Sequence, residues 1–323
     1  GFAICVVEPF MASIGGVGYM LFYESKSRKM YSIDYGPRAP ISAWDTMYQL
    51  DNTESSPYIG LGGVRNQENV RGYRSVGVPG VVAGLCYALE RFGTLSLGQV
   101  LEPAIGYAKY GFQTNWHTTL TIAGCMELLM NNVSAAATYL PNHRPPSHWP
   151  LPETFKQSHL ADVLELLAKK GADVFYKGEI ATAIGDEFAK NTGLLSSKDL
   201  ERYHVVCAQP LKTDYRSLQI HGVPQANGSF TMMQALNVLS HFSLSGLEQS
   251  SSEYLHLLAE TLRHVFADRY HFIGDPEFSS VPMKGLLNLE YSKKIAHSIT
   301  KDKTRFVLSE HTEPWIVYSD EAI

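Results

Sequence analysis

The sequence predicts a helix-rich α+β fold. Several long stretches place apolar side chains at helical spacing, whereas short apolar runs of strand length occur only near the beginning and the middle of the chain. The chain has 323 residues, of which 45% are hydrophobic and 18% are charged. A chain of this length and composition can bury a substantial core, and it does not by length alone fix the number of domains.

The first forty residues predict a hairpin at the centre of a sheet. Residues 19–23 form a continuous apolar run bounded by Gly18 and a polar turn, which favours a strand buried on both faces. Residues 29–34 predict the second strand, which ends at Gly36 and Pro37 because proline has no N–H for the ladder. The preceding glycines come before a strand rather than a helix, so they are not a dinucleotide fingerprint. These glycines either allow a tight backbone conformation or line a site.

The middle of the chain predicts helices separated by loops. Residues 41–76 form a long connection with a short strand near Tyr73–Val76. Helical stripes then follow over about 80–92, 97–110 with a fresh start at Pro103, 115–140, 160–170, 180–192, 232–242 and 252–271. Gly80 and Gly84, four residues apart, let the first of these helices approach a neighbour closely. Residues 141–152 form a proline-rich loop, and residues 211–215 and 218–222 predict a strand pair.

Composition excludes several classes of function. The net charge is −5 with no basic stripe, so nucleic acid is not an expected partner. No apolar run reaches the roughly 20 residues needed to span a bilayer, so no membrane segment is expected. The four cysteines, Cys5, Cys86, Cys125 and Cys207, are far apart, which favours buried free thiols and a reducing compartment. We therefore expect a cytoplasmic protein. The chain opens abruptly inside an apolar segment at Gly1, which leaves a periplasmic or secreted location open.

No self-contained catalytic or metal-binding set is present in the pattern. Gly-x-Ser-x-Gly and His-Glu-x-x-His are both absent. The histidines of the long helix near 252–271 lie seven or eight residues apart, and His143 and His148 have no acidic or cysteine partner nearby. We expect no metal and no cofactor.

A series of motifs resembles the gamma-glutamyltransferase family. They are Val6-Val-Glu-Pro9 with Gly15-Gly16-x-Gly18, Gly77-Val-Pro-Gly80, Arg91-Phe-Gly-Thr-Leu95, Leu101-Glu-Pro-Ala-Ile105, Phe175-Tyr-x-Gly178, Asp199-Leu-x-x-Tyr203, Ala267-Asp-Arg269, Gly274-Asp-Pro276 and Val281-Pro282. Each motif is weak by itself, but they occur in family order over roughly residues 5–292. Together they are highly specific.

The resemblance implies an N-terminal nucleophile hydrolase with a four-layer αββα sandwich. In that family a precursor cuts itself into a large and a small subunit, and the new N-terminal threonine of the small subunit is the nucleophile. Residues 1–323 resemble the large subunit, a portion of a single domain that a small subunit outside this chain completes. The family's Thr-Thr-His segment is absent, and Lys301–Ile323 has no clear match to it. The resemblance therefore implies that this chain carries no catalytic residue.

One substrate contact normally comes from the large subunit. In the family, an arginine in an Asp-x-Arg-Glu-x-Ala-Pro segment binds the α-carboxylate of the glutamyl group. Here the segment is Asp34-Tyr-Gly36-Pro-Arg38-Ala-Pro40, so Gly36 holds the arginine position and Arg38 follows two residues later. Arg38 is the candidate substrate-binding residue, and pairing elsewhere on the surface is its alternative. Pro224–Ser229 likewise replaces a proline-rich Ser-Gly-Gly loop of the family.

The resemblance leaves a leading function and two alternatives. The leading function is cleavage or transfer of a gamma-glutamyl amide, as in glutathione hydrolysis, through an acyl-enzyme. The substitution at Gly36 raises the alternative of an acylase or amidohydrolase that acts on a different carboxylate-bearing amide. The other alternative is an inactive homologue that serves as a scaffold.

Overall fold

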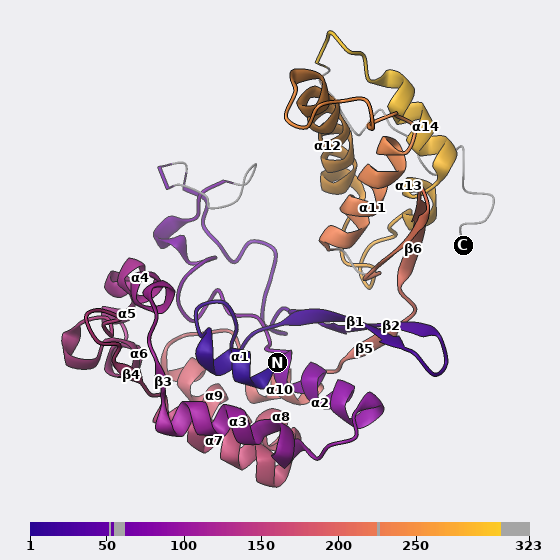
Figure 1. Ribbon diagram of the computed structural model, residues 1–323. Helices are drawn as coiled ribbons and strands as arrows, with labels where there is room; N and C mark the ends of the chain where they lie inside the picture. The colour runs from indigo at the N-terminus through magenta and orange to yellow at the C-terminus, as the bar shows by residue number, and fades with distance from the viewer. Residues whose placement is uncertain (52, 55–61, 225–226, 305–323) are drawn as a thin grey trace. The chain divides into compact units, whose positions relative to one another are not determined.

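The computed structural model describes residues 1–51, 53–54, 62–224 and 227–304. The chain divides into two compact units, the first made of residues 1–18 and 35–206 and the second of residues 19–34 together with the chain from 207 onward. Helices dominate both units and the strands are few and short (Figure 1). The predicted helix-rich α+β composition is therefore confirmed.

The first unit is built mainly of helices (Figure 1). They are α1 (Phe2–Val7), α2 (Val81–Phe92), α3 (Leu97–Tyr110), α4 (Trp116–Gly124), α5 (Met126–Met130), α6 (Val133–Tyr139), α7 (Ser158–Lys170), α8 (Asp173–Tyr176), α9 (Glu179–Lys190) and α10 (Ser197–Arg202), with the short antiparallel strands β3 (Phe112–Gln113) and β4 (Thr154–Phe155). The core lies where α1, α3 and α7 pack together, and Leu101, Leu164 and Leu167 are fully buried there. These residues belong to the apolar stripes from which the helices are predicted. Each helix therefore turns its apolar stripe toward the core.

Local signals set the ends of these helices. Ser96 and Gln99 form a capping box that satisfies the first N–H groups of α3. Gly111 and Gly171 follow α3 and α7 with φ of +88° and +78°, a conformation that costs a residue with a Cβ more than it costs glycine. The predicted ends of these helices, at residues 110 and 170, are confirmed.

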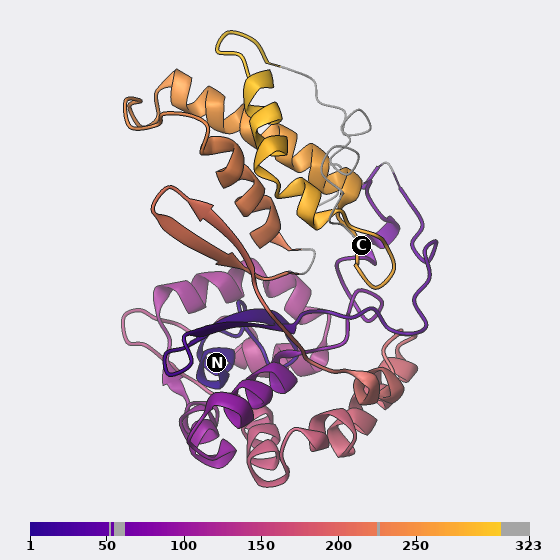
Figure 2. The same ribbon diagram turned by 90° about the vertical axis from the view of Figure 1, so that its right-hand side faces the viewer.

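The second unit combines a hairpin with helices (Figure 2). Beyond residue 210 its elements are β6 (Leu211–Tyr215), β7 (Leu218–Gly222), α11 (Gly228–Leu239), α12 (Ser252–Phe272), α13 (Met283–Leu286) and α14 (Leu289–Ser298). β6 and β7 are antiparallel, with a register that runs from Leu211 opposite Gly222 to Tyr215 opposite Leu218. Apolar side chains from α11, α13 and α14, among them Phe230 and Leu286, form the core of this unit.

The predicted N-terminal hairpin is present as β1 (Gly18–Glu24) and β2 (Lys29–Tyr35). Together with β5 (Val206–Ala208) they form a three-stranded sheet in the order β1-β2-β5, which places β2 in the middle (Figure 1). The prediction that residues 19–23 are buried on both faces is wrong for this chain. Exposure alternates along β1, and Tyr19, Leu21 and Tyr23 are 41%, 39% and 55% exposed.

Three other expectations differ from the structure. Tyr73–Val76 forms a turn and a bend rather than a strand, and an isolated antiparallel bridge between Arg38 and Val78 follows it. α3 runs through Pro103 without a break, so this proline does not begin a new helix. Residues 115–140 form the three separate helices α4, α5 and α6. Glu127 is the one Asp, Glu, Lys or Arg residue in this stretch, too few to mark an exposed helix face, so hydropathy alone does not locate its breaks.

Candidate functional site

The segment that follows β2 carries Arg38, the residue that the sequence singled out. Arg38 is half-buried, and its carbonyl accepts a hydrogen bond of 2.8 Å from the N–H of Val78. Its Nη1 donates to the carbonyl of Pro37 at 3.4 Å. A guanidinium presents its donors as a rigid planar fork, which is the geometry that binds a carboxylate with two hydrogen bonds. Arg38 thus has the chemistry of an anion-binding side chain, placed on a backbone that is fixed by the Val78 bridge.

Two side chains of the α10 turn hold this segment on either side of Arg38. The hydroxyl of Tyr203 donates to the carbonyl of Gly36 at 2.8 Å. Oδ1 of Asp199 accepts from the N–H of Ile41 at 2.6 Å. Asp199 and Tyr203 are four residues apart, which places them on the same side of a helical turn. The segment is therefore anchored before Arg38, at Arg38 and after it.

Asp199 itself is fixed by the start of α10. Its Oδ2 accepts hydrogen bonds from the N–H of Ser196 at 2.8 Å and from the Ser196 hydroxyl, which completes a capping box. Asp199 is 4% exposed. One carboxylate oxygen thus caps its own helix while the other holds a segment more than 150 residues earlier in the chain. The same carboxylate links the local helix start to the position of the Arg38 segment.

The ring of Tyr203 is positioned by Tyr176. The two rings are stacked, with centroids 5.6 Å apart and an interplanar angle of 15°. The hydroxyl of Tyr176 donates to the carbonyl of Pro79 at 3.0 Å and accepts from the N–H of Ala83 at 3.1 Å. Burial raises the pKa of Tyr176, so this phenol stays protonated and remains a hydrogen-bond donor. Tyr176 therefore connects the Tyr203 ring to the first turn of α2.

Close approaches at glycines complete this arrangement. A Cβ built at Gly80 would lie 2.1 Å from the Tyr203 hydroxyl, and one at Gly84 would lie 2.2 Å from Cγ of Tyr35. The prediction that Gly80 and Gly84 allow close packing of the helix is confirmed. The carbonyl of Gly16 accepts from the N–H groups of Gly80 and Val81 at 2.9 and 3.0 Å, and a Cβ at Gly16 would lie 3.0 Å from the carbonyl oxygen of Ser13.

The start of α11 is the other stretch that the sequence marked. Residues 225–226 of the loop 224–229 lie outside the described residues. Asn227 caps α11 by accepting from the N–H of Ser229 at 2.8 Å. Nη1 of Arg269 donates to the Asn227 carbonyl at 3.0 Å and to the Thr231 hydroxyl at 2.9 Å. These hydrogen bonds thus fix the first turn of α11.

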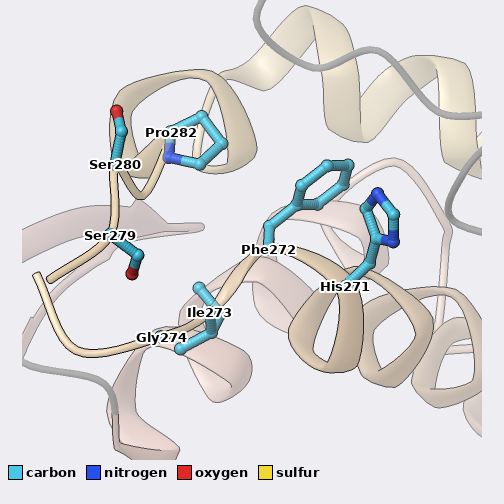
Figure 3. Close-up of a pocket in the computed structure, with 7 residues that line it drawn as sticks. All are labelled: His271, Phe272, Ile273, Gly274, Ser279, Ser280 and Pro282. Carbon is cyan, nitrogen blue, oxygen red and sulfur yellow. The ribbon is translucent and has the colours of Figure 1, made fainter.

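A shallow pocket in the second unit lies at the end of α12 (Figure 3). Its lining is His271, Phe272, Ile273, Gly274, Ser279, Ser280 and Pro282. The Ser279 hydroxyl donates to the carbonyl of Asp275 at 2.9 Å, and the His271 ring stands edge-on to Phe272 with centroids 4.5 Å apart. Another pocket, in the first unit, includes Cys5, Tyr139 and Gln157. Arg38 lines neither of these two pockets.

The described residues contain neither a ready metal site nor a membrane helix. Within these ranges, no group of three or more His, Cys, Asp or Glu side chains is arranged to hold a metal ion. No helix in the same part of the chain combines the length and the apolar character needed to cross a bilayer. None of the four cysteines forms a disulfide. Cys5 and Cys86 are buried, but Cys125 is exposed and Cys207 is half-buried, so the expectation of four buried thiols is wrong for two of them.

Sequence reasoning assigned no role to Tyr203, Asp199 or Tyr176. The Asp199-x-x-x-Tyr203 spacing is part of a family motif, and a spacing of four residues indicates two side chains on one side of a helical turn. The segment that they bind lies at residues 36–41, and nothing in the local sequence links it to α10. The fold supplies this link.

Comparisons with known proteins agree on one family. A family model described as gamma-glutamyltranspeptidase matches residues 1–320. The glutathione hydrolase proenzyme of Bacillus subtilis (strain 168) is 36% identical over 303 residues, which are 94% of this chain and 50% of that protein. The Acylase ACY 1 proenzyme of Pseudomonas sp. (strain SE83) is 35% identical over 292 residues, which are 90% of this chain and 51% of that protein. The chain thus spans about half the length of these curated relatives.

A solved structure extends the likeness to three dimensions. The crystal structure of the Helicobacter pylori gamma-glutamyltranspeptidase matches with a TM-score of 0.87 and 30% identity, over 98% of this chain and 86% of that chain. This likeness confirms the predicted fold class, the α+β fold of the N-terminal nucleophile hydrolases. It also confirms the family that the motifs indicated.

Proposed function

Since this chain belongs to the gamma-glutamyltranspeptidase family, we propose that it is the large subunit of an enzyme that cleaves or transfers a gamma-glutamyl amide through an acyl-enzyme. The observation that carries the proposal is the family match over residues 1–320. The chain also covers about half the length of the two curated relatives named above. The remaining half supplies the small subunit, released from the same precursor. The two pieces then complete one domain.

The chemistry follows from an N-terminal threonine, serine or cysteine on the small subunit. Its side chain attacks the amide carbonyl while its own α-amine accepts the proton. The C–N bond breaks, the leaving amine takes up that proton, and the acyl group stays on the enzyme as an ester or thioester. Water then gives hydrolysis, and an acceptor amine gives transfer. In this scheme no residue of the present chain forms or breaks a bond.

The contribution of this chain is to bind the acyl group of the substrate. Arg38 is the proposed contact for the substrate carboxylate, because its guanidinium has the planar fork that pairs with a carboxylate. The support for this role is that its main chain is held by Val78, while Tyr203 and Asp199 hold the segment on both sides. A binding group on a fixed backbone loses less entropy when substrate binds than one on a free loop.

The partner surface proposed for the small subunit includes β1. Tyr19, Leu21 and Tyr23 lie on one side of this strand and remain exposed. Side chains of this size on a strand stabilise a sheet when another layer covers them. Strands of the small subunit would cover this face and bury it in the interior of the sandwich.

An acylase acting on a different carboxylate-bearing amide is the second candidate. It is favoured by Gly36, which holds the position of the arginine in the family segment, and by the likeness to the Pseudomonas acylase proenzyme. The two candidates differ in whether the acyl group must carry an α-amine. A glutaryl amide has the carboxylate without the amine, whereas a gamma-glutamyl amide has both.

The test uses the complete gene product. We expect two fragments on a denaturing gel and a Thr, Ser or Cys at the N-terminus of the smaller one. Purified enzyme is then assayed with gamma-glutamyl p-nitroanilide and glutaryl p-nitroanilide. Preference for the first supports the gamma-glutamyl function, and preference for the second supports the acylase. An uncleaved protein that releases no chromophore from either substrate contradicts both and indicates a scaffold.

Arg38 is tested in the same assay. We expect Arg38→Ala to raise KM by about ten- to a hundredfold, because it removes a charge-assisted pair worth about 1.5–3 kcal/mol. Arg38→Lys keeps the charge but loses the planar fork, so its KM should lie between those of the parent enzyme and Arg38→Ala. Arg216→Ala, which removes an exposed arginine in the β6–β7 turn, is the matched control. Equal KM values for the parent enzyme and Arg38→Ala would remove Arg38 from the site.

A further inference from the structure

We infer that Tyr203 is a positioning residue that sets where Arg38 presents its guanidinium to the substrate carboxylate. This inference rests on the proposed function and adds to it a residue that makes no contact with substrate. It is carried by the hydrogen bond from the Tyr203 hydroxyl to the carbonyl of Gly36, two residues before Arg38.

The geometry of the segment explains why this bond controls Arg38. The main chain around Arg38 has three described anchors, namely Tyr203 at Gly36, Val78 at Arg38 and Asp199 at Ile41. The Val78 anchor is backbone to backbone, and Asp199 acts three residues after Arg38. Tyr203 is thus a side-chain anchor on the approach from β2. Without its hydroxyl, residues 36–37, which connect the end of β2 to the Val78 bridge, can shift while that bridge persists.

The surroundings of Tyr203 make its hydroxyl a fixed point. Its ring is stacked on Tyr176, whose own hydroxyl is held by Pro79 and Ala83. At Gly80, any side chain would come within 2.1 Å of the Tyr203 hydroxyl. Packing on one side and α2 on the other therefore fix the direction in which the hydroxyl points. A rigid donor of this kind transmits its position to the carbonyl that it binds.

The specific consequence concerns substrates that carry a carboxylate. A displacement of about 1 Å weakens a bidentate pair strongly, because both hydrogen bonds depend on distance and angle. An acyl group without a carboxylate gains nothing from Arg38, so its turnover does not depend on this placement. Tyr203 should therefore contribute to selectivity for the carboxylate and leave the remaining chemistry unchanged.

The test measures a ratio that misfolding does not change. Tyr203→Phe in the mature two-fragment enzyme removes the hydroxyl and keeps the ring that stacks on Tyr176. The kcat/KM values are compared for the better carboxylate substrate of the two anilides above and for butanoyl p-nitroanilide, which lacks the carboxylate. Loss of folded enzyme lowers both values equally and leaves the ratio unchanged. We expect the ratio to fall by about three- to tenfold through a higher KM for the carboxylate substrate.

Tyr73→Phe is the matched control, because Tyr73 also donates its hydroxyl to a distant partner, Glu187, over 2.7 Å. Its ratio should equal that of the parent enzyme. A ratio in Tyr203→Phe that stays at the parental value, whether both activities persist or both fall together, would overturn the positioning role. If Arg38→Ala also leaves the ratio unchanged, the proposed Arg38 contact fails. A fall with Arg38→Ala but not with Tyr203→Phe rejects Tyr203 alone.

Discussion

Gly84 of α2 lies directly against the ring of Tyr35 at the end of β2. A Cβ at this position would come within 2.2 Å of Cγ and 2.3 Å of Cδ1 of that ring. Gly84 is buried and Tyr35 is half-buried, so the contact belongs to the packed side of the ring. The absence of a side chain at one residue thus determines how closely a helix can approach the segment that continues to Arg38.

Gly84→Ala should destabilise the protein by about 1–3 kcal/mol, because the added methyl group forces α2 and Tyr35 apart in a packed region. The measurement is the midpoint of denaturant unfolding followed by circular dichroism. Gly106→Ala is the control, since Gly106 lies inside α3 and a methyl group added there would meet no atom within 4 Å. Alanine there should be neutral or stabilise by up to about 1 kcal/mol. Equal stability of the two variants would contradict the close approach.

Tyr291→Phe should cost about 1–3 kcal/mol of unfolding free energy. The Tyr291 hydroxyl donates to Oδ2 of Asp268 at 2.8 Å, and Nε2 of Gln234 donates to the same oxygen. Asp268 is 1% exposed, so water does not readily replace the lost donor. The control is Tyr270→Phe, because Tyr270 is 67% exposed and its change should stay within about 0.5 kcal/mol. Chemical denaturation of both variants checks this, and no difference between them would contradict a structural role for the buried pair.

The exposed side of β1 gives a prediction about assembly. Leu21→Lys places a charge among Tyr19 and Tyr23 on the face proposed to contact the small subunit, where burying it is costly. When the complete gene is expressed, we expect less small fragment to co-purify with this variant and a lower thermal midpoint of the complex. Leu95→Lys, at an exposed leucine between α2 and α3, should leave co-purification unchanged.

The same face should behave differently when the 323 residues are produced alone. Exposed apolar strands favour self-association, so we expect concentration-dependent oligomers in sedimentation velocity and binding of a hydrophobic dye. Leu21→Lys should reduce both. A monodisperse monomer that binds no dye would argue against a covering partner on β1.

Sequence patterns located the elements that bury an apolar stripe. The helices around Leu101 and Leu164 and the strands at 211–215 and 218–222 follow from periodicity and from glycine stops, both of which are local signals. Between 115 and 140 these signals are weak, since the stretch has almost no charge to separate its faces. Its three short helices therefore were not separable by pattern.

The candidate site was predictable only in part. Arg38 follows from its place in a family-like segment, which is a property of neighbouring residues. Its anchors come from residues 199 and 203, and sequence spacing contains no information about a pairing across more than 150 positions. The exposure of one side of β1 was not predictable, because an apolar run does not indicate whether each of its faces is covered by the same chain or by a different one.

The thiols give a prediction that depends on pH. Burial raises the pKa of Cys86 to about 11, whereas Cys125 is exposed at the end of α4. Since only the thiolate reacts, about one Cys86 in a thousand is reactive at pH 8, and burial slows access further. We expect a disulfide reagent at pH 8 to modify Cys125 quickly and Cys86 far more slowly. Below its pKa, the Cys86 rate should rise about tenfold for each added pH unit.

Cysteine variants identify which thiol is which. Cys125→Ser should remove the Cys125 contribution to the fast phase of labelling, and Cys86→Ser should leave that phase intact. Cys5 is buried like Cys86 and its pKa is raised by the same loss of hydration, so it should also react slowly in the folded protein. Mass spectrometry of peptides from briefly labelled protein reports each site separately. Labelling of Cys86 as fast as Cys125 at pH 8 would contradict the burial of Cys86 between α2 and its neighbours, and with it the close packing that Gly80 and Gly84 allow.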